Sequence, residues 1–256
     1  MLFIARVAFL IIFTISLFPA LAVASSAKIP ILCYHNLNPT KRGSMNMTPE
    51  KFESQIKYLQ DNHFNIIPLT QVVEYLKGKR DSLPSKPIAI TVDDGWKSVY
   101  SYMRPIILKH KIPVTLFIYP QTISAGKNSM TWDELNDLQQ TGLFDIQSHT
   151  YDHPNFKVLK RKFSSSKFDD YVRMQLVKSK KILEDKMGKK IALLAWPFGI
   201  YNQYLEQQAA RAGYEMAFTI NYEAAKRGYS AMAQPRFMII DSLSTNTFKG
   251  IVNQAR

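Results

Sequence analysis

The sequence of 256 residues contains one cysteine, and its 20 acidic residues are outnumbered by 33 basic ones, which gives a formal charge of +13. The single cysteine, Cys33, cannot form an intramolecular disulfide, so a small disulfide-stabilised domain is excluded. Because 46% of the residues are apolar and 12% are aromatic, the chain can fill a hydrophobic core. Disorder, a collagen-like chain and a coiled coil are excluded as well.

The first 24 residues are mostly apolar, and Arg6 carries their only charge. Residues 7–17 have the length of a signal-peptide hydrophobic segment, and Ala22-Val23-Ala24 offers the small residues that signal peptidase reads. We therefore predict a signal peptide over residues 1–24 and one exported domain over residues 25–256, located in the periplasm, at the cell surface or outside the cell. The alternative is an uncleaved anchor, because the apolar stretch approaches the roughly 20 residues that span a bilayer.

From Lys28 onward, short apolar runs alternate with amphipathic stretches, a pattern typical of an α/β fold with a mostly parallel sheet. Thr48-Pro49-Glu50 and Thr131 with Glu134 mark helix starts, and the longest helix is predicted over residues 167–187. The predicted strands are residues 29–34, 65–68, 88–92, 114–119, 144–148, 192–195, 216–220 and 236–240. Seven or eight such strands suggest a barrel.

The strongest chemical signal is the sequence TVDDG at residues 91–95, which ends a predicted buried strand. In a continuing strand Asp93 and Asp94 would point to opposite faces, but Gly95 allows the chain to turn there. Both carboxylates can then reach one cleft. Taken alone, Asp-Gly after a strand is more often a simple turn.

A second signal follows the predicted strand 144–148, where His149 and His153 are four residues apart. Two imidazoles at this spacing converge if the segment is helical or tightly turned, and one added carboxylate completes a two-histidine metal site with open positions for water. Both motifs end strands at the same edge of the predicted sheet. Their joint occurrence is much harder to attribute to chance than either motif alone.

These two motifs, together with AWPFG at residues 195–199, resemble the polysaccharide deacetylases of carbohydrate esterase family 4, whose domain is also called the NodB homology domain. ILCYHN at residues 31–36 and MTPEKFE at residues 47–53 are similar to the permuted branch that includes poly-β-1,6-N-acetylglucosamine deacetylases. The resemblance covers about residues 28–240. It implies a distorted (β/α)7-type barrel with the NodB-like fold, and metal-dependent removal of N-acetyl groups from an N-acetylglucosamine polymer.

The resemblance also implies a role for each matching residue. It makes Asp93 the general base and His35 the general acid. Pro197 has no N–H to offer an oxyanion, which leaves the backbone N–H of Phe198 or Gly199, and the resemblance points to Phe198. Trp196 is a candidate for stacking on a sugar, with core packing as the alternative. The implied ligands of one divalent ion, Zn²⁺ first and Co²⁺, Ni²⁺ or Fe²⁺ otherwise, are Asp94, His149 and His153.

The sequence departs from the family pattern in two places. Many members have an arginine that orients the base where this chain has Ala195, and Arg236 is our hypothesis for its substitute, with a purely structural arginine as the alternative. The family's fourth motif, with its paired Asp and Trp, is not recognisable.

Two other functions remain open. In the first, the same enzyme fold acts on peptidoglycan or a chitooligosaccharide. In the second, the chain is a carbohydrate-binding protein without activity. Nucleic acid is not an expected partner, because the sequence lacks its binding signatures and export separates it from DNA. We expect a monomer whose basic surface contacts the anionic cell envelope.

Overall fold

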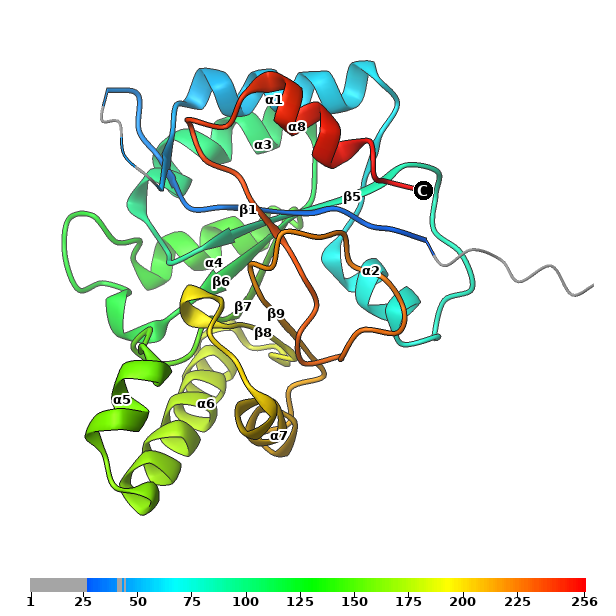
Figure 1. Cartoon of the computed structure of the whole chain (residues 1–256). Coiled ribbons are helices and arrows are strands. Elements are labelled where there is room, and N and C mark those ends of the chain that lie inside the picture. The colour runs from blue at the N-terminus through cyan, green and yellow to red at the C-terminus, as the bar shows by residue number, and fades with distance from the viewer. Residues whose placement is uncertain (1–26, 41–42, 44) are drawn as a thin grey trace, which may run out of the picture.

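The computed structural model in Figure 1 describes residues 27–40, 43 and 45–256. The predicted signal peptide, residues 1–24, lies outside the described residues. Among the residues that are described, no helix is both long enough and apolar enough to cross a membrane.

A curled sheet of parallel strands forms the centre of the molecule (Figure 1). Its strand order is β10-β1-β5-β6-β7-β8-β9, and β4 pairs with β5 away from this path. The fold is α/β, as predicted, and the strands are β1 (Ile31–Tyr34), β4 (Asn65–Ile66), β5 (Pro87–Asp93), β6 (Val114–Ile118), β7 (Phe144–Ser148), β8 (Leu193–Ala195), β9 (Met216–Phe218) and β10 (Phe237–Met238). A separate short pair is formed by β2 (Asn36–Leu37) and β3 (Asn46–Met47).

Residues 234–238 connect the two edges of this sheet. At one end Gln234 pairs with Phe218 of β9, and its N–H donates to the Ala217 carbonyl at 2.9 Å. At the other end β10 pairs with β1. Arg236 lies between these two pairings, with no exposed surface, so the closing segment carries a guanidinium into the barrel.

Helices surround the sheet, with α1, α3 and α8 near the top of Figure 1 and α5, α6 and α7 near its bottom. The predicted starts are confirmed, since Thr48 Oγ1 accepts the Lys51 N–H at 3.2 Å and Thr131 and Glu134 form a capping box. The helices are α1 (Pro49–Asp61), α2 (Leu69–Leu76), α3 (Arg104–His110), α4 (Trp132–Gln140), α5 (Phe156–Lys162), α6 (Ser165–Met187), α7 (Gln203–Arg211) and α8 (Thr245–Val252). Short π- or 3₁₀-helical turns are η1 (Val99–Met103), η2 (Pro120–Thr122) and η3 (Pro197–Gly199).

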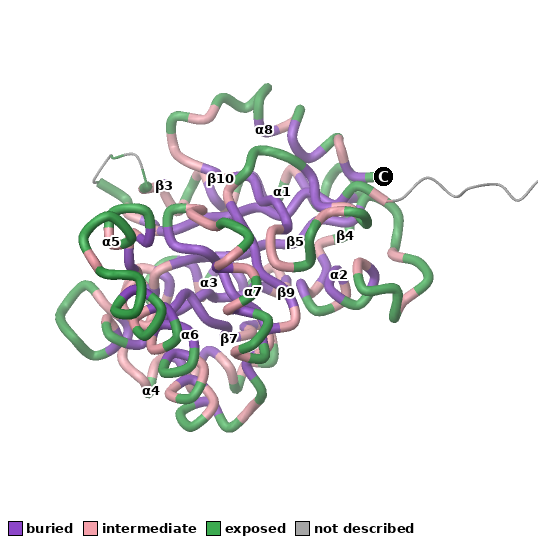
Figure 2. Tube along the Cα trace, turned by 60° about the horizontal axis from the view of Figure 1, so that its bottom comes forward, coloured by how far each residue is buried: buried purple, intermediate pink, exposed green. Residues whose placement is uncertain are grey.

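The strands are buried at the centre of the molecule (Figure 2), and their two faces have different partners. One face, which includes Leu32 and Ile90, packs against the helices in the larger apolar cluster. The other face, which includes Ile31, Ala89 and Phe117, forms a smaller cluster inside the barrel. Each fully buried side chain of this size stabilises the fold by about 1.5–3 kcal/mol. Strand alternation therefore decides which side chains at a strand end can enter the barrel.

Candidate active site

A pocket of about 370 Å³ opens where the strands end, at the carboxyl edge of the sheet, which is the usual position of sites in parallel α/β folds. It brings together most of the predicted site residues, and only Arg236 lies outside its lining. The lining residues are His35, Met45, Asp93, Asp94, His149, His153, Trp196, Phe198, Gly199, Ile220 and Met238.

Asp93, the last residue of β5, is 2% exposed and is held by Arg236 from the closing segment. The guanidinium donates two hydrogen bonds to the carboxylate, from Nη1 to Oδ1 at 2.8 Å and from Nη2 to Oδ2 at 2.7 Å. It also donates from Nε to the Thr219 carbonyl at 3.1 Å. A bidentate contact of this kind is what we expect if Arg236 replaces the arginine that many family members have where this chain has Ala195.

Opposing influences act on the ionisation of Asp93. Burial by itself raises the pKa of Asp93, but the positive charge of Arg236 and the imidazole of His149 outweigh it and hold this pKa well below its usual range. The carboxylate is therefore ionised at every physiological pH.

Asp94 adopts a left-handed backbone conformation, with φ of 81°, and Gly95 follows with φ of 87°. This turn is fixed by a hydrogen bond from the Asp94 N–H to the Phe117 carbonyl at 3.0 Å. The indole Nε1 of Trp96 donates to Asp94 Oδ2 at 3.0 Å. The other oxygen, Oδ1, faces the two imidazoles, so the chain turns at Asp94-Gly95 as the sequence predicts.

The two histidines of the second motif converge on Asp94. Nε2 of His149 and Nε2 of His153 each lie 3.7 Å from Asp94 Oδ1. A tight turn rather than a helix brings them together, with positive φ values of 66° at Thr150 and 58° at His153. His149 Nδ1 donates to the Ala195 carbonyl at 2.8 Å, which leaves the lone pair of its Nε2 directed at the cluster.

A family model described as polysaccharide deacetylase matches residues 80–217, more than half of the chain. The chain belongs to the polysaccharide deacetylase family. The matched segment contains both carboxylates of the pocket and two of its three histidines, His149 and His153. His35 and Arg236 lie outside it, so the contribution of these two side chains rests on the geometry of this deacetylase.

Named relatives come from the same family. YxkH of Bacillus subtilis (strain 168), whose name describes it as a polysaccharide deacetylase, is 28% identical over 231 residues. The match covers 90% of this chain and 78% of the relative. A poly-β-1,6-N-acetyl-D-glucosamine N-deacetylase of Staphylococcus epidermidis is 26% identical over 214 residues, 81% of this chain and 71% of the relative.

Solved deacetylase structures share the fold. Streptococcus pyogenes deacetylase PplD in complex with acetate superposes with a TM-score of 0.78 and 23% identity, covering 89% of this chain and 99% of that one. IcaB from Ammonifex degensii superposes with a TM-score of 0.76 and 21% identity, covering 89% and 97%. The NodB-like barrel fold predicted from the sequence is thereby confirmed.

The cluster Asp94, His149 and His153 in this deacetylase fits a divalent metal ion. Its three ligand atoms lie within 4.8 Å of one another, close to the roughly 3–4 Å between atoms bound to one zinc ion. Burial and the neighbouring His149 lower the pKa of His153 to about 4, so its imidazole is neutral and free to coordinate at neutral pH. One carboxylate and two imidazoles suit Zn²⁺ and the neighbouring transition metals alike.

His35 directly follows β1, and one of its ring nitrogens lies within 4.8 Å of both an Asp93 carboxylate oxygen and Cys33 Sγ. It is 8% exposed, and its Nδ1 is buried without a hydrogen-bond partner among the described residues. The pKa of His35 is lowered, because the effect of burial outweighs the charges of Asp93 and Asp94, which act to raise it. Since His35 lines the pocket, its imidazole is placed to meet a substrate there, and the unpaired nitrogen calls for a partner.

Cys33 is a site neighbour that the sequence predictions do not include. Its thiol lies 3.5 Å from Asp93 Oδ2, and burial raises the pKa of this thiol well above its usual value. The sulfur is therefore a neutral, weak donor to the carboxylate. Strand alternation is the signal that places it there, since Cys33 and Asp93 both face the barrel interior.

The third motif contributes Phe198, whose backbone is left-handed with φ of 57°. Its N–H donates no hydrogen bond within the described part of the chain, whereas the next N–H, of Gly199, donates to the Trp196 carbonyl at 2.9 Å. The Phe198 ring is 55% exposed and meets His153 edge to face, with ring centroids 4.5 Å apart. A free donor thus lies at the edge of the pocket beside the cluster of metal-ligand type.

Trp196 requires a correction to the suggested stacking on a sugar. Only 1% of it is exposed, its Nε1 donates to the Met232 carbonyl at 2.8 Å, and its ring contacts Phe156. Its indole therefore has no open face for a sugar, and core packing is the role that its burial supports.

Proposed function

We propose that this polysaccharide deacetylase is a metal-dependent hydrolase that removes N-acetyl groups from poly-β-1,6-N-acetylglucosamine. The observation that carries the proposal is the pairing, in one pocket, of the cluster Asp94, His149 and His153 with a separately clamped carboxylate, Asp93. His149 Nε2 lies 3.8 Å from Asp93 Oδ2, so the two parts are adjacent. The choice of polymer is supported by the staphylococcal relatives named for it.

Asp93 takes the proton of the attacking water. Arg236 keeps the carboxylate ionised and fixes both of its oxygens, which orients the base but also makes it a weak one. Asp94, His149 and His153 would hold a divalent cation, which would supply Lewis acidity that makes the attacking water easier to deprotonate and so offsets this weak basicity.

The Phe198 N–H donates to the acetamide oxygen as that oxygen gains negative charge. His35 gives a proton to the sugar nitrogen, because an amide nitrogen cannot leave as an anion. Since burial lowers the pKa of His35, its protonated form is a stronger acid than an ordinary imidazolium, which favours transfer to this weakly basic nitrogen. Water is consumed, the C–N bond breaks, and acetate and a free amino sugar are released.

The test is acetate release, measured in parallel on β-1,6-linked and β-1,4-linked N-acetylglucosamine oligomers and on peptidoglycan. We expect the highest kcat/KM on the β-1,6 oligomer, loss of activity after chelation, and recovery with Zn²⁺, Co²⁺, Ni²⁺ or Fe²⁺. Higher activity on peptidoglycan or the β-1,4 oligomer would reassign the substrate. Binding without acetate release, with every one of these metals, would indicate a carbohydrate-binding protein and refute the proposal.

Export of residues 25–256 belongs to the same proposal, because the polymer lies outside the cytoplasm. N-terminal sequencing of the protein from the periplasm or medium should give Ser25 as the first residue. A chain that retains residues 1–24 in the membrane fraction would support the anchor instead.

A further inference from the structure

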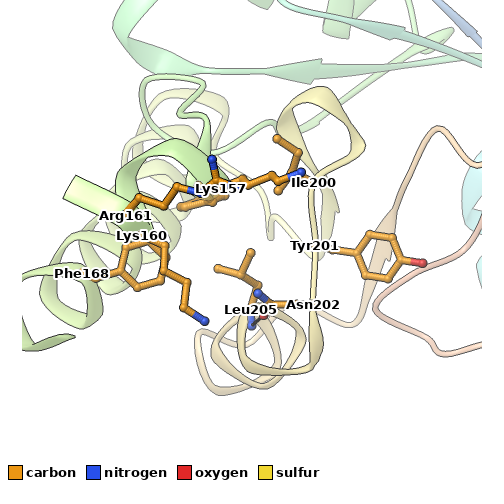
Figure 3. A pocket seen from close by; sticks show the side chains of 9 residues that line it. Lys157, Lys160, Arg161, Phe168, Ile200, Tyr201, Asn202 and Leu205 are labelled. Carbon is orange, nitrogen blue, oxygen red and sulfur yellow. Dashed lines mark hydrogen bonds between the residues drawn. The ribbon is translucent and has the colours of Figure 1, made fainter. Parts of the chain in front are cut away.

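A second pocket, of about 470 Å³, lies between α5, the first turn of α6 and the start of α7 (Figure 3). Phe156, Phe168 and Leu205 give it an apolar floor, and all three are buried. Figure 3 shows the side chains of α5 along one side and Ile200 and Asn202 along the other. Its volume is within the range of small-molecule sites and can hold a sugar residue with a substituent.

Three cations from α5 line this pocket, namely Lys157, Lys160 and Arg161. All three are exposed, and within the part of the chain that the structure describes no carboxylate lies within ion-pairing distance of them. Asp169, on the neighbouring α6, accepts a hydrogen bond from the Tyr204 hydroxyl at 2.6 Å instead. The rim of the pocket therefore carries positive charge that no described carboxylate neutralises.

Another hollow lined by lysines shows the opposite arrangement. Lys77 and Lys190 are both paired with Glu215, and Lys189 is paired with Asp145. Among the described residues, carboxylates of the protein thus neutralise three of the four lysines of that hollow and none of the three cations of the α5 pocket. Unpaired cations around a concave surface attract anions.

Both walls of the α5 pocket continue from loops that line the catalytic pocket. α5 begins three residues after His153, so the Cα atoms of His153 and Lys157 lie within about 15 Å of each other. The facing wall begins at Ile200, directly after Gly199 of the catalytic pocket. A polymer with one sugar at the catalytic pocket can therefore extend toward the α5 pocket with a unit further along the chain.

We propose that the α5 pocket is a subsite for an anionic substituent, a carboxylate or a phosphate, carried by the polysaccharide being deacetylated. The inference rests on the proposed function, because it extends the same substrate into a second pocket. The cations bind the substituent and the apolar floor covers the adjacent sugar face. The preferred substrate is then an N-acetylglucosamine polymer that bears acidic groups. Three of the cations behind the net charge of +13 would thus serve in substrate binding.

The experiment compares O-carboxymethyl and O-hydroxyethyl derivatives of one N-acetylglucosamine oligomer, which differ in charge but little in size. The full protein should show about a tenfold higher kcat/KM on the carboxymethyl oligomer at low salt, mainly through KM. Added NaCl should abolish this preference by screening. In the triple variant Lys157→Gln, Lys160→Gln, Arg161→Gln the preference should disappear, while kcat/KM on the hydroxyethyl oligomer stays within about twofold.

A matched control removes three positive charges elsewhere, by Lys57→Gln, Lys79→Gln and Lys186→Gln, at exposed positions outside both pockets. This variant should keep the preference for the carboxymethyl oligomer. Equal loss in both variants would show a diffuse effect of net charge and overturn the subsite.

Other outcomes separate the subsite from the proposed function. If the wild-type protein deacetylates both oligomers equally well, the subsite is wrong and the proposed function stands. If it releases acetate from neither, the proposed function fails first. If the α5 triple variant loses binding to phosphatidylglycerol vesicles but keeps its carboxymethyl preference, the pocket is a lipid site and the polysaccharide subsite is overturned.

Discussion

Asp93 and Asp94 are neighbours in the chain and differ in almost every physical respect. Asp93 ends a regular strand, faces the barrel interior and is clamped by the buried guanidinium of Arg236. Asp94 lies in a left-handed turn at the pocket surface, where its side chain is 17% exposed, and it faces the imidazoles of His149 and His153.

The difference teaches how one dipeptide supplies two chemical roles. A carboxylate paired with a guanidinium is oriented and ionised, but its charge is already compensated. A carboxylate that faces imidazole nitrogens, and that among the described residues accepts a hydrogen bond only from the Trp96 indole, keeps its charge available for a cation. The turn at Gly95 produces this division, because it ends the strand alternation between the two residues.

Loss of His35 should impair proton transfer around Asp93 and leave metal binding by the cluster that contains Asp94 intact. His35→Gln removes the proposed general acid, so kcat should fall by about 10² to 10⁴-fold with metal content unchanged. Turnover of an N-acetyl substrate with an activated leaving group should fall much less, because it needs little protonation. An equal fall on both substrates, or a loss of metal, would contradict the role of His35.

Changes at Arg236 should act through Asp93 alone. Arg236→Met leaves a buried carboxylate unpaired, and we expect the free energy of unfolding to fall by about 3–5 kcal/mol. Arg236→Lys keeps the charge but not the bidentate contact. Weaker stabilisation of the carboxylate raises the pKa of Asp93, so the acidic limb of the kcat/KM profile should move to higher pH.

The lysine variant also gives the result that would remove this role. If Arg236→Lys folds, binds metal and shows an unshifted acidic limb with full turnover, Arg236 is only structural. Calorimetry and metal analysis on the same preparation distinguish the two outcomes.

Trp96 should matter to Asp94 and not to Asp93. Trp96→Phe removes the donor to Asp94 Oδ2 but keeps an aromatic ring, so metal affinity should fall by about 10 to 100-fold. At saturating metal, the acidic limb of the kcat/KM profile should match that of the wild type. An unchanged metal affinity in a competition assay with a chelator would show that the indole does not orient this carboxylate.

A surface carboxylate provides the control for the buried pair. The side chains of Lys190 and Lys77 lower the pKa of Glu215 to about 2, but this cluster lies at the surface, so Glu215→Gln should cost only about 0.2–1 kcal/mol at pH 7. Since the folded-state pKa is depressed, the contribution is present above about pH 4.5 and is lost as the pH falls toward 2. Unfolding by urea at pH 7 and pH 3 measures it, and a cost like that of Arg236→Met would refute the contrast.

The fold class and the central cluster could be predicted because their signals are local. Asp93, Asp94, His149 and His153 belong to two short motifs at strand ends, and parallel strands bring such ends to one edge. The exact strand lengths could not be predicted, because ladder pairing ends where the sheet curls. The predicted strand 236–240 is reduced to Phe237–Met238, although the Ile239 N–H still donates to the Cys33 carbonyl of β1 at 2.9 Å.

Other features have no local signal. The contact between Arg236 and Asp93 spans 143 residues, and only the alanine at position 195 indicated that a distant arginine was needed. The Ala195 carbonyl that orients His149 is a backbone group, which no residue type announces. The helices α5 and α7, which form the second pocket, are short, and the sequence pattern does not indicate them clearly. The pocket between them could therefore not be predicted from the sequence.

Asp93 and Asp94 have separate roles in the proposed mechanism, and one paired measurement tests this division. Asp93→Asn and Asp94→Asn are purified in parallel, loaded with Zn²⁺, and assayed for bound metal and for acetate release from the β-1,6 oligomer. We predict that Asp93→Asn retains metal near one equivalent while losing turnover, and that Asp94→Asn loses both. Loss of metal in Asp93→Asn, or full metal retention in Asp94→Asn, would contradict the account.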